Sequence, residues 1–136
     1  MNQITSETIK TADTWVEFSN QKNLERLSAV TAEKLALEGP KGTGVINHQE
    51  LGEWMKRANL KLTTIKRYAR GQFIVLEQTG TWLNDDDSVK GTGIVFTVFK
   101  IADGKVTFLA RYDHDKDKAF EVSGLSDEDR IKSEPL

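Results

Sequence analysis

The sequence predicts an α+β fold in which three N-terminal helices pack on one face of a curved, mainly antiparallel β-sheet. Before residue 60, apolar side chains recur at helical spacing along three segments. From Leu60 onward they alternate with period two or run continuously, and β-branched and aromatic residues dominate. A curved sheet with helices across its open face forms a cone, whose interior is a natural apolar pocket.

The three helices are predicted as follows. The first covers residues 9–20, where apolar residues recur three and four positions apart, and the second covers residues 24–30 after the N-cap candidate Asn23. Asn47 and Glu50 form a capping-box pattern, which satisfies free N–H groups at a helix start. The third helix then carries an apolar stripe at positions i, i+3, i+4 and i+7: Leu51, Trp54, Met55 and Ala58.

Strands are expected in two parts of the chain. A short one covers residues 35–37, and the Gly-rich run of residues 39–44 breaks regular structure after it. Asp103-Gly104, between two β runs, is a strong hairpin signal because both turn residues need a positive φ. Several segments are apolar on both sides, so the sheet needs helices on one face and a partner on the other. The second half holds four strands: Leu62–Ala69, Gln72–Trp82, Val89–Ile101 and Lys105–Asp113.

Length and charge suit one soluble domain. Of the 136 residues, 1–125 are expected to form the domain and the charged segment 126–136 a flexible tail. A net charge of −2 does not favour nucleic-acid binding, which needs a clustered cationic excess. Met1–Thr14 shows no secretion signal, and the longest apolar stretch, Ile94–Ile101, is too short to span a membrane. We therefore expect a cytoplasmic protein without membrane contact.

The residue counts restrict the chemistry of any site. With no Cys, thiolate ligands, disulfides and a Cys nucleophile are excluded. His48 and His114 are the only histidines, so a metal site of several His ligands is excluded as well. We expect both histidines and the acidic tip 84–88 to be solvated. No metal and no cofactor is expected, which leaves carboxylates, Arg and water to carry any reaction.

Several local strings occur in a family-specific order. They are Trp15, Asn23–Leu27, Leu37–Gly42, Trp54, and Phe99–Val106 continuing to Arg111–Asp113. Over residues 4–116, this order resembles the nuclear-transport-factor-2-like (NTF2-like) superfamily, in particular its SnoaL-like and ketosteroid-isomerase-like branch. The resemblance implies a cystatin-like cone with a hydrophobic pocket for a small hydrophobic molecule. It also implies a homodimer through the outer face of the sheet.

The resemblance does not carry over the isomerase chemistry. Ketosteroid isomerases place a base Asp before the Pro that matches Pro40, where this chain has Gly39, and Glu38 beside it is expected to point the other way. Trp15 stands in the place of the family's oxyanion-stabilising Tyr. The position of the family's protonated Asp falls within the apolar run of residues 94–97, which contains no Asp. The Asp-Arg-Asp set of epoxide hydrolases has no match either. Steroid isomerisation by the family mechanism is therefore not expected.

The last predicted strand supplies two candidate catalytic residues. Arg111 and Asp113 stand two positions apart, so they share one face of the strand. If that face lines the cone, Arg111 could hold an anionic or carbonyl oxygen while Asp113 moves a proton. In the alternative, the cone is lined by the opposite face, which leaves both residues in water. That face carries Val106, Phe108, Ala110 and Tyr112.

Glu77 is the third candidate, because it interrupts an apolar face in a central strand. A carboxyl in an apolar cavity has a raised pKa and can act as an acid or base near neutrality. Alternatively, it pairs with Lys66, Arg67 or Arg111 across the sheet. The predicted apolar wall of the pocket is formed by Trp15, Phe18, Trp54, Met55, Tyr68 and Phe73, each of which could equally be plain core.

Two functions remain open at this point. The first is a SnoaL-like protein that binds a small hydrophobic molecule and could catalyse a cofactor-free isomerisation, cyclisation, hydration or dehydration through Glu77, Arg111 or Asp113. The second is a non-catalytic binding or dimerisation module, in which the cone is filled by its own aromatic residues. The volume of the cavity and the direction of the ionisable side chains distinguish the two.

Overall fold

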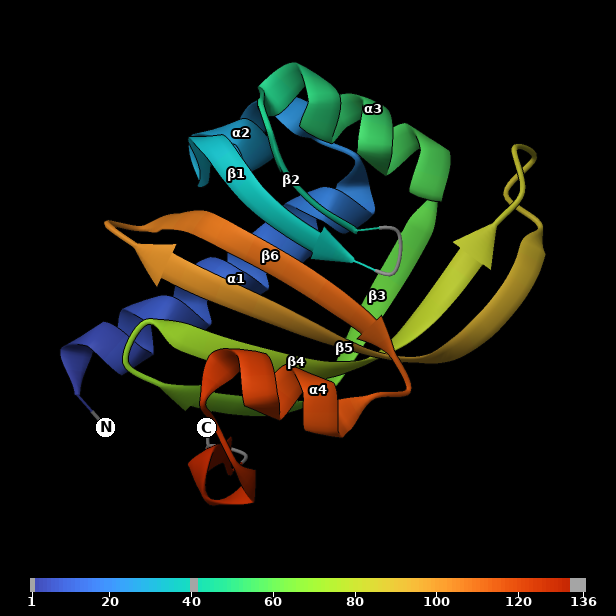
Figure 1. Ribbon diagram of the computed structural model, residues 1–136. Coiled ribbons are helices and arrows are strands. Elements are labelled where there is room, and N and C mark those ends of the chain that lie inside the picture. The colour runs from blue at the N-terminus through green and yellow to red at the C-terminus, as the bar shows by residue number, and fades with distance from the viewer. Residues whose placement is uncertain (1, 40–41, 133–136) are drawn as a thin grey trace.

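The computed structural model describes residues 2–39 and 42–132 (Figure 1). The helices are α1 (Gln3–Gln21), α2 (Leu24–Ala29), α3 (His48–Ala58), α4 (Lys116–Ser123) and the 3₁₀ helix η1 (Asp127–Asp129). The strands are β1 (Thr31–Gly39), β2 (Gly42–Ile46), β3 (Leu60–Arg70), β4 (Phe73–Leu83), β5 (Val89–Ala102), β6 (Lys105–Asp113) and β7 (Arg130–Ile131). They form one sheet in the order β2-β1-β6-β5-β4-β3-β7, in which β1 and β6 run parallel and the other neighbours antiparallel.

The ends of the helices follow from their local sequence. Asn2 caps α1 by accepting a hydrogen bond from the Thr5 N–H at 2.8 Å. The predicted capping box of α3 is confirmed, since Asn47 and Glu50 each bond to the other's backbone N–H. The helix ends at Asn59, which adopts the left-handed conformation with φ 39°.

The predicted order of elements is right from β3 to β6 and incomplete before and after these strands. The four predicted strands correspond to β3–β6 with bounds that differ by at most two residues. The three helices are not consecutive, because β1 and β2 form a hairpin between α2 and α3. The expected strand at 35–37 is the middle of β1, and β2 and α4 were not predicted. Residues 40–41 of the Gly-rich run lie outside the described residues.

Each face of the sheet carries its own apolar cluster. The concave face packs against α1, α2 and α3 around the fully buried Trp15, Leu51 and Phe99. The outer face carries a smaller cluster with Val75 and Phe96, and α4 lies across it on the side opposite α1 (Figure 1). Among the described helices, none is long and apolar enough to cross a membrane.

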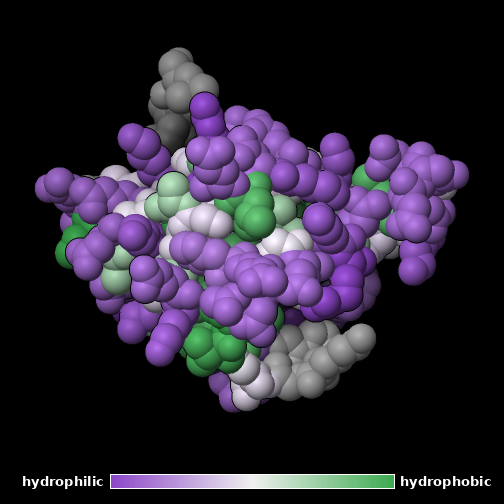
Figure 2. All heavy atoms as spheres, turned by 90° about the horizontal axis from the view of Figure 1, so that it is seen from above, coloured by the Kyte–Doolittle hydropathy of each residue, from purple (hydrophilic) through white to green (hydrophobic). Residues whose placement is uncertain are grey.

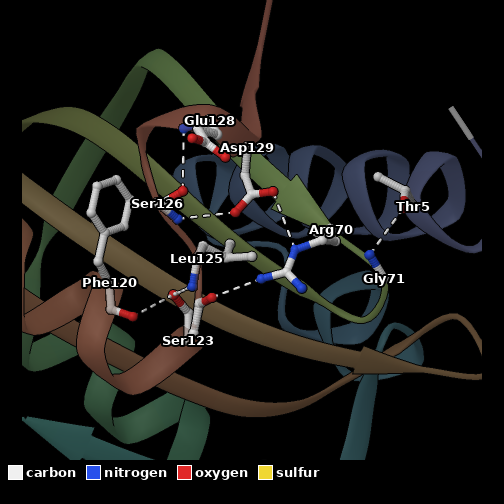
Figure 3. A network of polar contacts seen from close by, with 10 residues as sticks. Thr5, Arg70, Gly71, Phe120, Ser123, Leu125, Ser126, Glu128 and Asp129 are labelled. Atoms are coloured by element: carbon white, nitrogen blue, oxygen red, sulfur yellow. Dashed lines mark hydrogen bonds and ion pairs between the residues drawn. The ribbon is translucent and has the colours of Figure 1, made fainter.

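The segment after α4 forms a clasp on the outer face (Figure 3). Ser126 caps η1, and β7 pairs with β3. Arg70 donates to the Gly124 carbonyl at 2.8 Å and to the Asp129 carboxylate at 3.2 Å, while Leu125 is buried beneath. The expectation of a tail from Ser126 did not foresee these contacts, because they join residues more than 50 positions apart. Residues 133–136 of that expected tail lie outside the described residues.

We expect Arg70→Met to loosen this clasp. The change removes two hydrogen bonds but little buried area, so it should lower the free energy of unfolding by about 1 kcal/mol. It should also accelerate amide hydrogen exchange between residues 124 and 131. Urea denaturation and exchange mass spectrometry measure the two effects. Exchange at wild-type rates would show that Arg70 does not hold the clasp.

Candidate functional site

A row of polar side chains crosses the concave face on four neighbouring strands. Gln78 on β4 donates to the Thr64 hydroxyl on β3 at 3.2 Å and accepts from the Thr97 hydroxyl on β5 at 2.7 Å. Arg111 on β6 in turn donates through Nε to Thr97 Oγ1 at 3.3 Å. Gln78 and Thr97 have no exposed surface, and the row satisfies their polar atoms. A hydrogen-bonded series therefore ends on a guanidinium inside the cone.

Arg111 is the cation at the centre of the site. Its guanidinium lies over the indole of Trp54, 5.3 Å from the ring centroid. The described residues form three ion pairs, and Arg111 takes part in none of them. Burial lowers the pKa of Arg111 to about 10, while the negative charge of Asp113 acts in the opposite direction. The protein thus keeps a charged group in a poorly solvated place without a carboxylate against it.

The guanidinium borders a small cavity between α1, α3 and the sheet. The cavity measures about 10 Å³, which is room for a single water molecule. Much of the cone is filled by the protein itself, including Trp15 and Phe99, whose ring centroids are 5.2 Å apart. The lining of the small cavity includes two cations, Lys22 and Arg111, and no carboxylate. The lining residues are Ser19, Lys22, Trp54, Met55, Ala58, Leu60, Leu62 and Arg111. The site is therefore electropositive, and nearly closed in this conformation.

The structure brings two of the three candidate catalytic residues to one face. Arg111 and Asp113 both point to the concave side, where Asp113 pairs in register with Val95 of the concave cluster and is exposed at the strand end. Phe108, Ala110 and Tyr112 belong to the outer cluster, so the alternative in which their face lines the cone is wrong; only Val106, beyond a register shift, belongs to the concave cluster. Glu77 pairs with Phe96 on the outer side and is separated from Arg111 by the sheet. The expected position of Glu77 inside the cone is thus incorrect.

The six predicted wall residues divide between the two faces. Trp15, Phe18, Trp54 and Met55 belong to the concave cluster, and the last two line the cavity. Tyr68 and Phe73 belong to the outer cluster instead. For Tyr68 the cause is a bulge between Thr64 and Lys66, which shifts the alternation of β3 by one residue. Phe73 stands one position before the concave-facing Ile74 and therefore points outward.

Residues near the family's catalytic position serve the outer face. Glu38 accepts a hydrogen bond from the Tyr112 hydroxyl at 2.8 Å, so it points away from the cone as predicted. Burial and this carboxylate together raise the pKa of Tyr112.

His48 was expected to be solvated, but its Nε2 lies 3.0 Å from the Thr31 carbonyl and 3.1 Å from that of Ala32. It joins α3 to the start of β1.

Sequence reasoning missed Thr64, Gln78 and Thr97. A weak signal was present, because Gln78 and Thr97 are polar residues within otherwise apolar strand runs. Only the pairing of β3, β4, β5 and β6 brings them together with Arg111. Within residues 2–39 and 42–132, no three His, Cys, Asp or Glu side chains are grouped so that they could hold a metal ion.

No protein-family model and no curated protein matches this sequence. Solved structures do match it. The chain is similar to an NTF2-like protein of unknown function from Cytophaga hutchinsonii, with a TM-score of 0.67 and 18% identity over 88% of this chain and 97% of the other. The chain has an NTF2-like fold. Its α+β architecture, a curved sheet with helices on the concave face, agrees with the fold class that the sequence resemblance implied.

Two other similar structures are described by an activity. One is a candidate ketosteroid isomerase from Kribbella flavida, with a TM-score of 0.68 and 18% identity over 82% of this chain and 80% of the other. The second is a candidate polyketide cyclase from Sinorhizobium meliloti, with a TM-score of 0.64 and 12% identity over 76% and 94%. At these identities the likeness establishes the NTF2-like fold.

Proposed function

We propose that the protein binds a small, mainly hydrophobic organic molecule in the cone, with an anionic or carbonyl oxygen held by Arg111. The observation that carries this proposal is the partly buried Arg111 guanidinium, which forms no ion pair with a carboxylate of the described residues. A buried charge is costly unless it is paired, so a ligand oxygen is the natural partner. Lys22 at the same cavity adds a second positive charge. The small-molecule activities by which two similar structures are described also support a small organic ligand.

The proposed chemistry is cofactor-free proton transfer of the isomerase, cyclase or hydrolase type. Arg111 would stabilise the negative oxygen that develops when a proton leaves the carbon beside a carbonyl. Asp113 lies on the same face and is the group that would take this proton. On Arg111 the Nε atom is used by Thr97, so both Nη groups remain for the ligand oxygen. Thr97 therefore acts as a positioning residue.

Binding of benzoate tests the role of Arg111. Wild-type protein should bind benzoate in preference to benzyl alcohol, and Arg111→Met should weaken benzoate binding at least tenfold because the charge-assisted hydrogen bonds are lost. Arg26→Met is the matched control, since Arg26 also lies over an aromatic ring, Phe18, but on the exposed surface. Isothermal titration calorimetry measures both. Equal affinity of wild type and Arg111→Met would contradict the proposal.

Proton exchange tests Asp113. Phenylacetone offers a carbonyl oxygen and acidic protons on the neighbouring carbon, and NMR follows their replacement by deuterium. We expect wild-type protein to accelerate this exchange and Asp113→Asn to abolish the acceleration. If Asp113→Asn exchanges as fast as wild type, Asp113 is not the base.

The filled cone favours a second candidate, a non-catalytic binding or dimerisation module. A cavity of about 10 Å³ holds no organic molecule as it stands. The homodimer expected through the outer sheet face would have to form beside or over α4, which covers part of that face. Seen from the α3 side, the surface is largely hydrophilic with small separate apolar areas (Figure 2). Native mass spectrometry distinguishes the candidates, because it reports both the number of subunits and any bound small molecule.

A further inference from the structure

Trp54 separates two spaces of very different size. One side of its side chain borders the cavity of about 10 Å³ over Arg111, and the other side borders a groove of about 230 Å³ between α3 and the β1–β2 hairpin. The groove is lined by Leu37, Ile46, Glu50, Glu53, Trp54 and Arg57. A small movement of one side chain would therefore exchange empty volume in the groove for empty volume over the guanidinium.

Trp54 is held less firmly than Trp15, another tryptophan of the concave cluster. Trp15 is fully buried, and its indole N–H donates to the Thr31 hydroxyl at 3.0 Å. Trp54 is half-buried, and its indole N–H has no hydrogen-bond acceptor among the described residues. Its main polar contact is the face of its ring on the Arg111 guanidinium. That contact is the one that an anionic ligand would replace.

The opposite wall of the cavity is fixed. Asn20 of α1 donates to the Leu62 carbonyl and accepts from the Leu62 N–H of β3, each at 2.8 Å. This pair of hydrogen bonds ties α1 to β3 beside the lining residues Ser19 and Leu62. Space for a ligand is therefore gained on the Trp54 side rather than by parting α1 from the sheet.

The charges show which way the ring moves and what takes its place. The groove carries two carboxylates, Glu50 and Glu53, against one cation, Arg57, so its net charge disfavours an anion, whereas Leu37 and Ile46 offer an indole ring apolar contacts. Arg111 and Lys22 border the cavity, and their positive charges attract an anion. A flat carboxylate on Arg111 keeps a planar group on the guanidinium and adds two parallel hydrogen bonds. Flat, conjugated carboxylates thus fit the space that the ring leaves.

We propose that Trp54 is a displaceable cover, which moves from Arg111 into the groove when a small conjugated carboxylate binds. The inference rests on the proposed function, since it specifies the ligand class of the same site. A closed cover lowers the apparent affinity by the fraction of molecules that are open, so removing the ring should strengthen and accelerate binding.

The test uses the full chain labelled with 5-fluorotryptophan and benzoate as the probe. The three ¹⁹F resonances are assigned with Trp54→Phe and Trp82→Phe. We expect benzoate to shift the Trp54 resonance while that of Trp15 stays in place. In stopped-flow measurements, Trp54→Ala should bind benzoate at least ten times faster than wild type, with Trp82→Phe as the control that keeps the cover.

The outcomes separate the two proposals. If benzoate binds in an Arg111-dependent way but leaves the Trp54 resonance and the association rate unchanged, the cover is refuted and the anion site stands. If benzoate binds neither wild type nor Trp54→Ala, both proposals fail. Because the ¹⁹F measurement is made on the unmutated chain, it holds even if Trp54→Ala folds poorly.

Discussion

Arg111→Met should make the protein more stable while it weakens anion binding at least tenfold. Burial holds the pKa of Arg111 at about 10, below its ordinary value, so the protonated form is disfavoured by folding. This penalty is on the order of 3 kcal/mol, whereas losing the contacts with Trp54 and Thr97 costs about 1–2 kcal/mol. Methionine fills a similar volume without a charge. We therefore expect the free energy of unfolding to rise by about 1–2 kcal/mol at neutral pH.

The pH dependence has a definite sign. For a cation whose pKa is lower in the folded state, the cost is fully present below about pH 10 and disappears as the pH rises from there toward the pKa of free arginine. The advantage of Arg111→Met should thus be constant between pH 6 and 9. Urea denaturation measures it, and Arg26→Met should change stability by less than about 0.5 kcal/mol. A loss of stability in Arg111→Met would mean that the guanidinium supports the fold instead of burdening it.

Trp15→Ala should be among the most damaging single changes in the cone. Trp15 is fully buried against Phe99, and its N–H satisfies the Thr31 hydroxyl, which itself donates to the Leu27 carbonyl at 2.7 Å. Truncation leaves a large cavity and removes one buried hydrogen bond. We expect the free energy of unfolding to fall by about 3–5 kcal/mol.

Two matched variants divide this effect into its parts. Trp15→Phe keeps most of the ring volume and loses the bond to Thr31, so it should cost about 1–2 kcal/mol. Trp54→Ala removes a half-buried ring that makes no hydrogen bond within the described residues, and it should cost clearly less than Trp15→Ala. Chemical denaturation followed by circular dichroism compares the three. Equal losses for Trp15→Ala and Trp54→Ala would contradict the distinction between a fixed and a displaceable tryptophan.

Much of the fold could be predicted from the chain because its strongest signals are local. The capping box at Asn47 and the alternation in β3–β6 depend on neighbouring residues only. β2 escaped prediction because it is a five-residue edge strand with two glycines and the exposed Val45. α4 was missed because Lys116–Lys118 is charged and its apolar residues are few.

The site was predicted less completely, for physical reasons. The i, i+2 spacing placed Arg111 and Asp113 on one face. When a strand carries apolar residues on both faces, however, no local pattern indicates which face packs against the helices. The bulge in β3 turned Tyr68 outward, and a single extra residue leaves no mark in the composition. The partners of Arg111 arise from cross-strand pairing, which a linear pattern does not encode.

The clasp on the outer face also sets an order of events during synthesis. The residues that cover Val75, Phe96 and Ala110 lie after position 115, so they are translated later than all the strands from β1 to β6. Until they emerge from the ribosome, all the strands from β1 to β6 can exist with one apolar face bare. An uncovered sheet is the kind of intermediate that other chains and chaperones bind. The segment after position 115 thus decides whether the nascent chain covers that face itself or leaves it exposed to other chains.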